Sequence, residues 1–147
     1  MSEQNNSTSS VINLAVESVM DLIDALGLFA TITRGALGTE EGLCCEVAPS
    51  SVDEMYMDKN QYINLDLTIN GKHKNMLTLS DDMNLIHQDL TMLREYPEGD
   101  GWKIVDIRTI TLPQMIGREA NNVWIMASSL SVRVFTDLPY TPETKGE

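Results

Sequence analysis

Cysteine, histidine and basic residues are scarce in this sequence of 147 residues, which has two cysteines, two histidines and ten lysines and arginines together. The two cysteines, Cys44 and Cys45, are neighbours, and a disulfide between adjacent residues would strain the geometry that such bonds require. We therefore expect both to be reduced packing residues and the fold to form without a disulfide scaffold.

Long apolar runs are also missing from the chain. No stretch approaches the roughly 20 apolar residues that a membrane-spanning helix needs. The start of the chain, MSEQNNSTSS, has neither the basic nor the apolar region of a secretory signal. We expect a protein that stays in the cytosol where it is made and does not contact a membrane.

The few basic residues are outnumbered by 22 acidic ones, which gives a formal net charge of -12. Binding to nucleic acid through counterion release needs clustered lysines and arginines, so this charge argues against direct DNA binding. Most of the carboxylates are expected to be solvated surface groups. Any that line a channel would repel phosphate.

Composition indicates one packed domain, because 42% of the residues are hydrophobic and 22% are charged, close to the globular average. The polar segments at the two ends differ from this body. We expect a flexible N-terminal leader at residues 1–9, a single α+β domain at 10–138 and a flexible C-terminal tail at 139–147.

The first helix is predicted by apolar residues that recur at intervals of mostly three or four. Ser9 and Ser10 are its candidate N-caps, and Gly27 is its expected stop. The recurring residues are Val11, Ile12, Val16, Val19, Met20, Ile23 and Leu26.

The next part of the chain contains a loop and one or two strands. Residues 35–42 contain several glycines and indicate a loop, and LCCEVA at 43–48 predicts a short strand that Pro49 ends. The segment SSVDEMYMDKN at 50–60 fits a helix with a capping box as well as it fits an edge strand, and both readings stay open.

The clearest strand is predicted at Tyr62–Ile69, where apolar and polar residues alternate. The dipeptide Asn70-Gly71 is typical of a type I′ turn, so we expect a hairpin whose second strand, 72–79, returns antiparallel. A second helix should follow with Ser80 as its N-cap and end before Pro97.

Two long strands are expected in the last third, after a turn at 98–101. In WKIVDIRTITL, residues 102–112, the apolar residues do not stay on one face of the strand but switch from one face to the other. This pattern indicates a bulge or burial on both faces. Residues 113–121 are expected to form a loop with Gly117 as its pivot, and Asn122–Phe135 the last strand, antiparallel to the first. The elements predict an α+β fold with an antiparallel or mixed β-sheet and two main helices packed on one face.

Catalytic signatures are not found in the sequence. It has no phosphate loop, dinucleotide fingerprint or nucleophile elbow. His73 and His87 each lack a second ligand at metal-binding spacing, and adjacent strand residues such as Cys45 and Glu46 point to opposite faces. We expect a protein that is not an enzyme, with no catalytic residue, metal site or cofactor.

Two groups of residues are candidates for contact with other subunits. KHK at 72–74 is the only basic cluster, and it is either a solvated hairpin tip or a contact for an acidic patch on a neighbouring subunit. Loops carried by a rigid sheet are frequent contact sites, so the expected loop at 113–121 is the second candidate. The candidate interface residues are Lys72, His73, Lys74, Gln114, Met115, Arg118 and Glu119.

Two segments resemble a known family, the minor capsid and tail terminator proteins of phages and prophages of Gram-positive bacteria, including phage tail-like bacteriocins. The segments are YINLDLTINGKHKN, and YPEGDGWKIVDIRTITLPQMIGREANNVWIMASSLSVRVF after the second helix. The resemblance covers about residues 52–136 and includes the closing strand, in which Trp124 precedes SLSVRV. It contains no catalytic motif.

The resemblance implies a structural protein of the virion, assembled in the cytoplasm of the host bacterium. Such a subunit forms a homohexameric ring on the last ring of the tail tube, stops tube growth and offers a surface to the head connector, or neck, protein. In a contractile tail the ring would also contact the sheath protein. DNA would pass through the lumen without specific binding.

Two other functions remain open from the sequence. One is another phage morphogenesis component, such as a head-tail connector, a stopper or another minor capsid protein, since these share small size, acidity and an α+β build. The other is a small monomeric ligand-binding or inhibitor protein, which would remain a single chain at high concentration.

Overall fold

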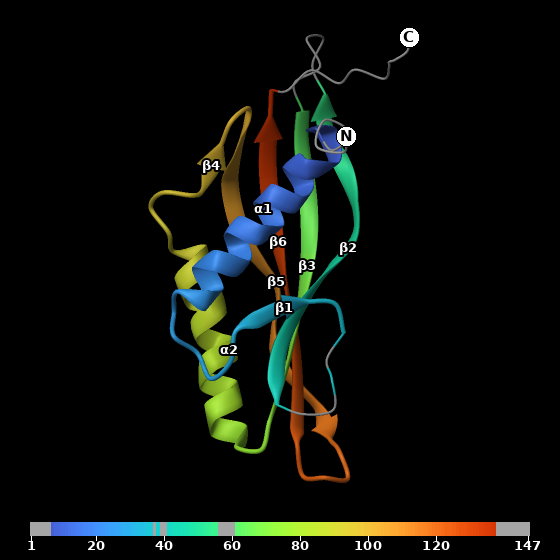
Figure 1. The fold of residues 1–147 in the computed structure, drawn as a ribbon, viewed down its shortest axis with the longest axis vertical. Coiled ribbons are helices and arrows are strands. Elements are labelled where there is room, and N and C mark those ends of the chain that lie inside the picture. Colours follow the sequence, from blue (N-terminus) through green and yellow to red (C-terminus); the bar gives the residue numbers. More distant parts are fainter. Residues whose placement is uncertain (1–6, 37, 39–40, 56–60, 138–147) are drawn as a thin grey trace.

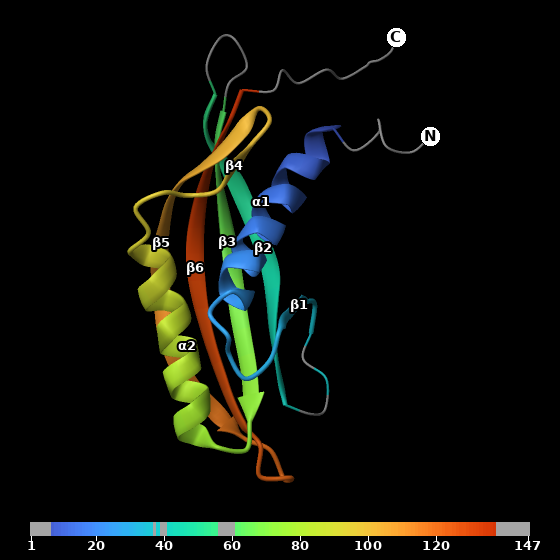
Figure 2. The ribbon, with the colours of Figure 1, turned by 60° about the vertical axis from the view of Figure 1, so that its left-hand side comes forward.

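A six-stranded mixed sheet with two helices on one face forms the protein (Figures 1 and 2). The computed structural model describes residues 7–36, 38, 41–55 and 61–137. This arrangement confirms the predicted fold class. The predicted C-terminal tail at 139–147 and residues 1–6 of the predicted leader lie outside the described residues, and the first helix already begins at Ser7.

Strand order in the sheet is β1-β2-β3-β6-β5-β4, and only the β1–β2 pair is parallel. The two longest pairings join β3 to β6 and β6 to β5, both antiparallel, as predicted for the last two strands. The elements are α1 (Ser7–Asp24), β1 (Ile32–Arg34), β2 (Gly42–Met55), β3 (Gln61–His73), α2 (Met76–Thr91), β4 (Glu98–Gly99), β5 (Trp102–Arg118) and β6 (Trp124–Thr136).

The core lies between the sheet and the two helices. Strand β6 alternates regularly, because every second residue from Met126 to Thr136 is buried and faces the helices. The first helix buries the stripe that its periodicity predicts, and Gly27 follows it with φ of 71°, a conformation that glycine adopts without strain. The largest fully buried side chains include Ile23, Leu43, Leu65, Leu67, Ile69, Leu79, Met83, Ile86, Leu90, Ile107 and Leu130.

The predicted hairpin at Asn70-Gly71 is wrong. Strand β3 continues through both residues to His73, and the chain then enters α2 instead of a returning strand. Gly71 has a packing role: a Cβ atom there would lie 2.8 Å from Leu79 Cδ1 and 3.2 Å from Met83 Sδ. Glycine is thus required because α2 packs very close to the sheet, a demand that the dipeptide alone does not reveal.

The predicted start of the second helix is also wrong. Its N-cap is Asn75, whose side chain accepts hydrogen bonds from the backbone N–H groups of Leu77 and Thr78 at 2.9 and 3.1 Å. Ser80 lies inside α2, one turn further on. Both Ser80 and Asn75 are common capping residues, and the chain uses the earlier one because β3 ends there. The predicted end before Pro97 is confirmed.

Three further boundaries differ from the prediction. Ser9 and Ser10 lie within α1, two and three residues after its start. Strand β2 runs through Pro49, which falls inside a register shift between Ala48 and Ser51, where a missing N–H is tolerated. Residues 50–55 therefore take the strand form of the two that were left open, and 56–60 lie outside the described residues.

Strand β5 extends through most of the segment predicted as a loop at 113–121. It continues to Arg118 and includes Pro113, because β4 covers only Trp102 and Lys103 and the rest of β5 is an edge. The predicted bulge is confirmed, with four register shifts between β5 and β6. Gly117 lies at one of them, but the turn itself pivots at Asn122, with φ of 68°.

Candidate interaction surface

One end of the molecule, where β3 leads into α2, brings the two predicted contact groups together. Lys72 Nζ lies 2.9 Å from Glu119 Oε2 and donates a second hydrogen bond to the Gly38 carbonyl at 2.7 Å. Lys72 is only 7% exposed, so its ammonium is used inside the chain. It joins the end of β3 to the β1–β2 connection and to the β5–β6 turn, and thereby holds this end of the sheet in one shape.

The next two residues of the predicted cluster take part in the same local network. Glu41 Oε2 accepts a hydrogen bond from the Lys74 backbone N–H at 2.9 Å and lies 3.7 Å from His73 Nδ1. That nitrogen accepts a hydrogen bond from the Asn75 N–H at 2.9 Å, so it has no proton to share with Glu41 in this arrangement. The Phe29 ring meets His73 edge to face, with 4.6 Å between the ring centres.

The predicted residues on β5 lie on different faces of the sheet. Gln114 is paired with Ala127 on the helix-free face, whereas Met115 is paired with Met126 on the helix side. Arg118 stacks over Trp124, with its guanidinium carbon 5.1 Å from the ring centre. These exposed positions can all reach a partner, but they do not form one patch.

A surface that the sequence did not reveal lies along the outer edge of β5. Ile110, Leu112 and Ile116 are 53%, 64% and 63% exposed. Each falls in a register shift, without a partner on β6. We call these three residues the β5 ridge. Bulged positions direct side chains away from the regular face, and exposed apolar groups gathered on one edge indicate a contact with another protein.

The phase change in residues 102–112 was the only sequence signal for the β5 ridge. It predicted a bulge or two-sided burial, but alternation cannot tell a buried apolar residue from one turned outward by a bulge. Assigning 113–121 to a loop also hid the continuity of the edge. The prediction therefore chose Gln114 and Met115, which lie beside the ridge, and missed the three apolar residues that form it.

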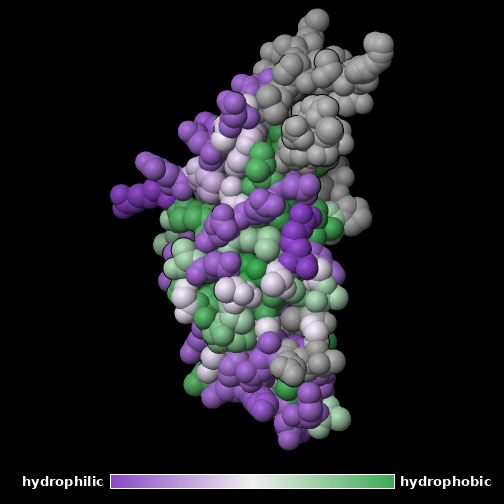
Figure 3. Space-filling model, viewed as in Figure 1, coloured by the Kyte–Doolittle hydropathy of each residue, from purple (hydrophilic) through white to green (hydrophobic). Residues whose placement is uncertain are grey.

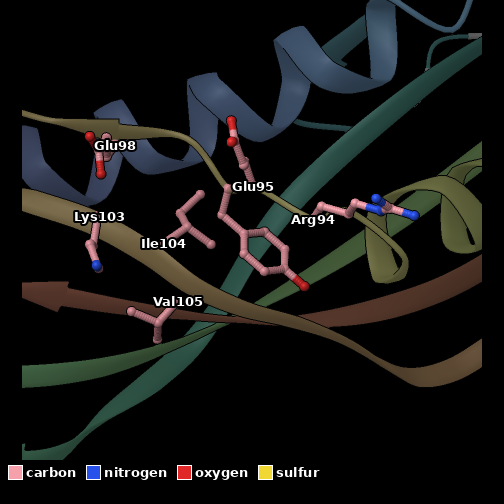
Figure 4. Close-up of a pocket in the computed structure, with 7 residues that line it drawn as sticks. Arg94, Glu95, Glu98, Lys103, Ile104 and Val105 are labelled. Carbon is pink, nitrogen blue, oxygen red and sulfur yellow. The ribbon is translucent and has the colours of Figure 1, made fainter.

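A cavity of 580 Å³ lies between the α2–β4 connection and the start of β5 (Figure 4). In Figure 4 the Arg94 guanidinium and the Glu95 carboxylate point away from each other, and Lys103 and Val105 leave the same side of β5. Charges of both signs line the cavity, without the paired nucleophile and base of a hydrolase. The lining residues are Arg94, Glu95, Tyr96, Glu98, Lys103, Ile104 and Val105.

Groups able to bind metal or attack a substrate are separated or buried. Within the described ranges no three histidine, cysteine, aspartate or glutamate residues gather at a possible metal site. Both cysteines are free and buried, and burial raises the pKa of Cys45 to about 11, which disfavours the reactive thiolate. Burial lowers the pKa of His87, whose Nδ1 lies 2.9 Å from Thr109 Oγ1.

Charge is divided between the two layers of the fold. Residues 7–31 and 76–101, which contain both helices, carry nine carboxylates and one arginine, whereas strands β1, β2, β3, β5 and β6 together carry six basic and five acidic residues. Hydrophilic side chains accordingly cover much of the helix-bearing face (Figure 3). An acidic face of this kind repels the phosphate groups of nucleic acid. In the part of the chain that the structure describes, no helix is long and apolar enough to cross a membrane.

Comparison with known proteins identifies one family. The family described as bacteriophage tail terminator protein matches residues 22–134. A chain in the virion of a native gene transfer agent particle is similar in fold, with a TM-score of 0.57 and 12% identity over 88% of this chain and 98% of that chain. A comparison with curated protein sequences gives no significant match.

Proposed function

Because the chain belongs to the bacteriophage tail terminator family and is thus a structural protein of a phage tail, we propose that it forms a ring at the head-proximal end of the tail tube. The ring stops tube growth and offers a surface to the head connector. The family match over residues 22–134 is the observation that carries this proposal, since it includes both sheet edges and α2.

The fold supports assembly into a closed ring. The short edge strands β1 and β4 cover only one end of the long strands β2 and β5, and the two edges of the sheet differ in sequence and shape. Unlike edges favour head-to-tail contacts, which close into a ring when the rotation between copies is suitable. Closure also covers strand edges that would otherwise promote aggregation. We propose six copies, with the tail tube protein and, in a contractile tail, the sheath protein as neighbours.

We further propose that the protein acts through these contacts and not through catalysis. The charge distribution supports a passive role toward DNA, because the acidic helical layer would let the genome slide past wherever it faces the lumen. Replacing the lumen-facing carboxylates by their amides should slow DNA passage while leaving rings intact. Unchanged DNA ejection by particles with these substitutions would contradict that role.

Electron microscopy of particles made without this protein tests the proposed function. Loss of a terminator should give tails that are longer than normal and carry no heads. Restoring the wild-type protein should return tails of one length joined to heads. Tails of normal length without heads would instead assign the protein to the connector, the second candidate, which the present observations do not favour.

A further inference from the structure

The two edges of the sheet are left open in different ways. Strand β1 pairs only with Leu43–Cys45 of β2, and β4 pairs only with Trp102–Lys103 of β5. Beyond these short strands, the rest of each outer edge has no neighbouring strand among the described residues. Figure 1 shows the two edges on opposite sides of the molecule. A second copy placed beside the first would therefore bring a β5 edge against a β1–β2 edge.

The β5 edge offers apolar side chains and not a regular row of backbone groups. Ile110, Leu112 and Ile116 are more than half exposed, and none has a partner on β6. The register shifts that turn them outward also interrupt the backbone pattern that would add a further strand. This edge is therefore suited to side-chain packing in a recess of the partner.

The opposite edge has such a recess. Strand β1 stops at Arg34 while β2 continues, and a shallow cavity of 480 Å³ occupies the place where a longer β1 would lie. We call this cavity the β2 indentation. Its lining residues are Arg34, Gly35, Cys45, Glu46 and Val47.

Ile110 and Leu112 of the β5 ridge lie at the same height along the strands as the β2 indentation, whereas Ile116 is level with Gly42 and Leu43, next to the end of β2 that β1 covers. One row of paired residues crosses the sheet from Glu46 through Thr68 and Ser129 to Thr111. Glu46 lines the indentation, and Thr111 lies between Ile110 and Leu112. A copy displaced sideways along this row thus brings Ile110 and Leu112 to the indentation without any slip along the strand direction.

Each of the two surfaces carries one charge of each sign, Arg34 and Glu46 at the indentation and Arg108 and Asp106 beside the ridge. The side chain of Arg108 is 74% exposed. Its row of paired residues runs through Ser131 and Asp66 to Ala48, and Ala48 lies two residues beyond Glu46 on β2. Its Nε contacts Asp106 at 2.8 Å, which leaves the other guanidinium N–H groups for a partner. In the displaced copy Arg108 approaches Glu46 of its neighbour, and opposite charges favour this register.

We propose that the β5 ridge of one copy packs into the β2 indentation of the next copy, and that this contact joins the subunits of the ring. The inference rests on the proposed function and adds to it the two surfaces that meet. The occupant is a second copy because the two surfaces lie on one molecule, with Ile110 and Leu112 level with the indentation and with charges of both signs beside each surface. Repeating the contact with a constant rotation closes a ring whose strands run along its axis.

The first test compares two substitutions of leucine by aspartate. Leu112 lies in the ridge and Leu77 lies on α2, and their exposures are nearly equal at 64% and 67%. Leu112→Asp should raise the concentration needed for ring formation by about tenfold or more, since a charge at the centre of an apolar contact is strongly unfavourable. Leu77→Asp should leave it unchanged. The readout is native mass across a dilution series, with circular dichroism to confirm folding.

The second test examines the pairing inside assembled particles. Arg108→Cys combined with Glu46→Cys should give covalently linked multimers with a short bismaleimide cross-linker, which can span the two-residue offset between these positions that a disulfide cannot, whereas either substitution alone should give single chains. The native cysteines are buried and add little background. Single chains from the double variant in intact particles would overturn the inference.

The outcomes separate this inference from the proposed function. If Leu112→Asp rings are as stable as those of the wild type, the inference is wrong while the ring stands. If the wild-type protein is a single chain in solution, cross-linking in assembled particles decides the inference. Tails of normal length in particles without the protein would contradict the proposed function itself, whatever the cross-links show.

Discussion

The Lys72 ammonium and the Glu119 carboxylate, 47 positions apart in the sequence, meet at 2.9 Å and tie the end of β3 to the turn between β5 and β6. The side chain of Lys72 is 9% exposed, whereas that of Glu119 is 36% exposed. Removing one partner should therefore destabilise the fold by different amounts, depending on which charge is left unpaired. The buried cation depends on its partner, and the carboxylate can still reach water.

This difference predicts unequal effects of two substitutions. Glu119→Ala leaves a buried ammonium with the Gly38 carbonyl as its remaining partner, so we expect a loss of about 2–3 kcal/mol in the free energy of unfolding. Lys72→Met leaves a carboxylate in partial contact with water and should cost about 1 kcal/mol. Urea denaturation of both variants checks the order. A larger loss for Lys72→Met would contradict the argument that an unpaired Lys72 ammonium is the costlier of the two unpaired charges.

A Cβ atom at Gly71 would meet side chains of the packed core. Gly71→Ala should destabilise the fold by about 1–3 kcal/mol, because Leu79, Leu43 and Met83 must move to admit the methyl group. Gly117→Ala is the matched control, since nothing lies within 4 Å of a Cβ there and its φ is not positive. Thermal unfolding should separate the two. Equal melting temperatures would contradict the close packing of α2 on β3.

The cap of α2 predicts a second pair of substitutions. Asn75→Ala removes the acceptor for the N–H groups of Leu77 and Thr78 and should cost about 1 kcal/mol. Ser80→Ala, at the position that the sequence pattern favoured, should change stability by less than about 0.5 kcal/mol. Chemical denaturation measures both. A larger effect at Ser80 would place the start of the helix where the sequence prediction had it.

Burial of His87 predicts a dependence of stability on pH. Folding lowers the pKa of this imidazole below its ordinary value of 6.5 because burial disfavours the charged form. Below pH 6.5 the unfolded chain therefore takes up a proton that the folded chain does not, and stability falls as the pH drops toward the folded pKa, by at most about 1.4 kcal/mol per pH unit.

The His87→Gln variant isolates this contribution. Glutamine cannot titrate, so the difference in unfolding free energy between wild type and variant should shrink as the pH falls from 7 to 5.5. Guanidinium denaturation at several pH values provides the measurement. Parallel pH profiles for the two proteins would show that His87 does not titrate differently on folding.

The sequence predicted the parts of the fold that regular alternation controls. The alternation of Tyr62–Ile69 in β3, the apolar stripe of α1 and the α+β class follow from patterns with periods of two and 3.6 residues. The turn at Asn70-Gly71 failed because the same glycine can serve a hairpin or a close helix contact, and only the packing of Leu79 decides between them. Local preference cannot supply that information.

The interaction surface was less accessible to prediction. Lys72 and Glu119 were both chosen as contact residues, but the sequence could not show that they bind each other. The β5 ridge depends on bulges at Ile110, Leu112 and Ile116, and their positions are set by the pairing of β5 with β6 and not by β5 alone. Long-range pairing therefore determines which of these apolar residues face outward.

Termination of tail growth is tested most directly by adding the purified protein to tail tubes that are lengthening in vitro and following tube length by electron microscopy. The proposed function predicts that tubes stop growing after the addition and carry this protein at the growing end. Tubes that continue to lengthen at an unchanged rate, with the protein folded and present in excess, would contradict it.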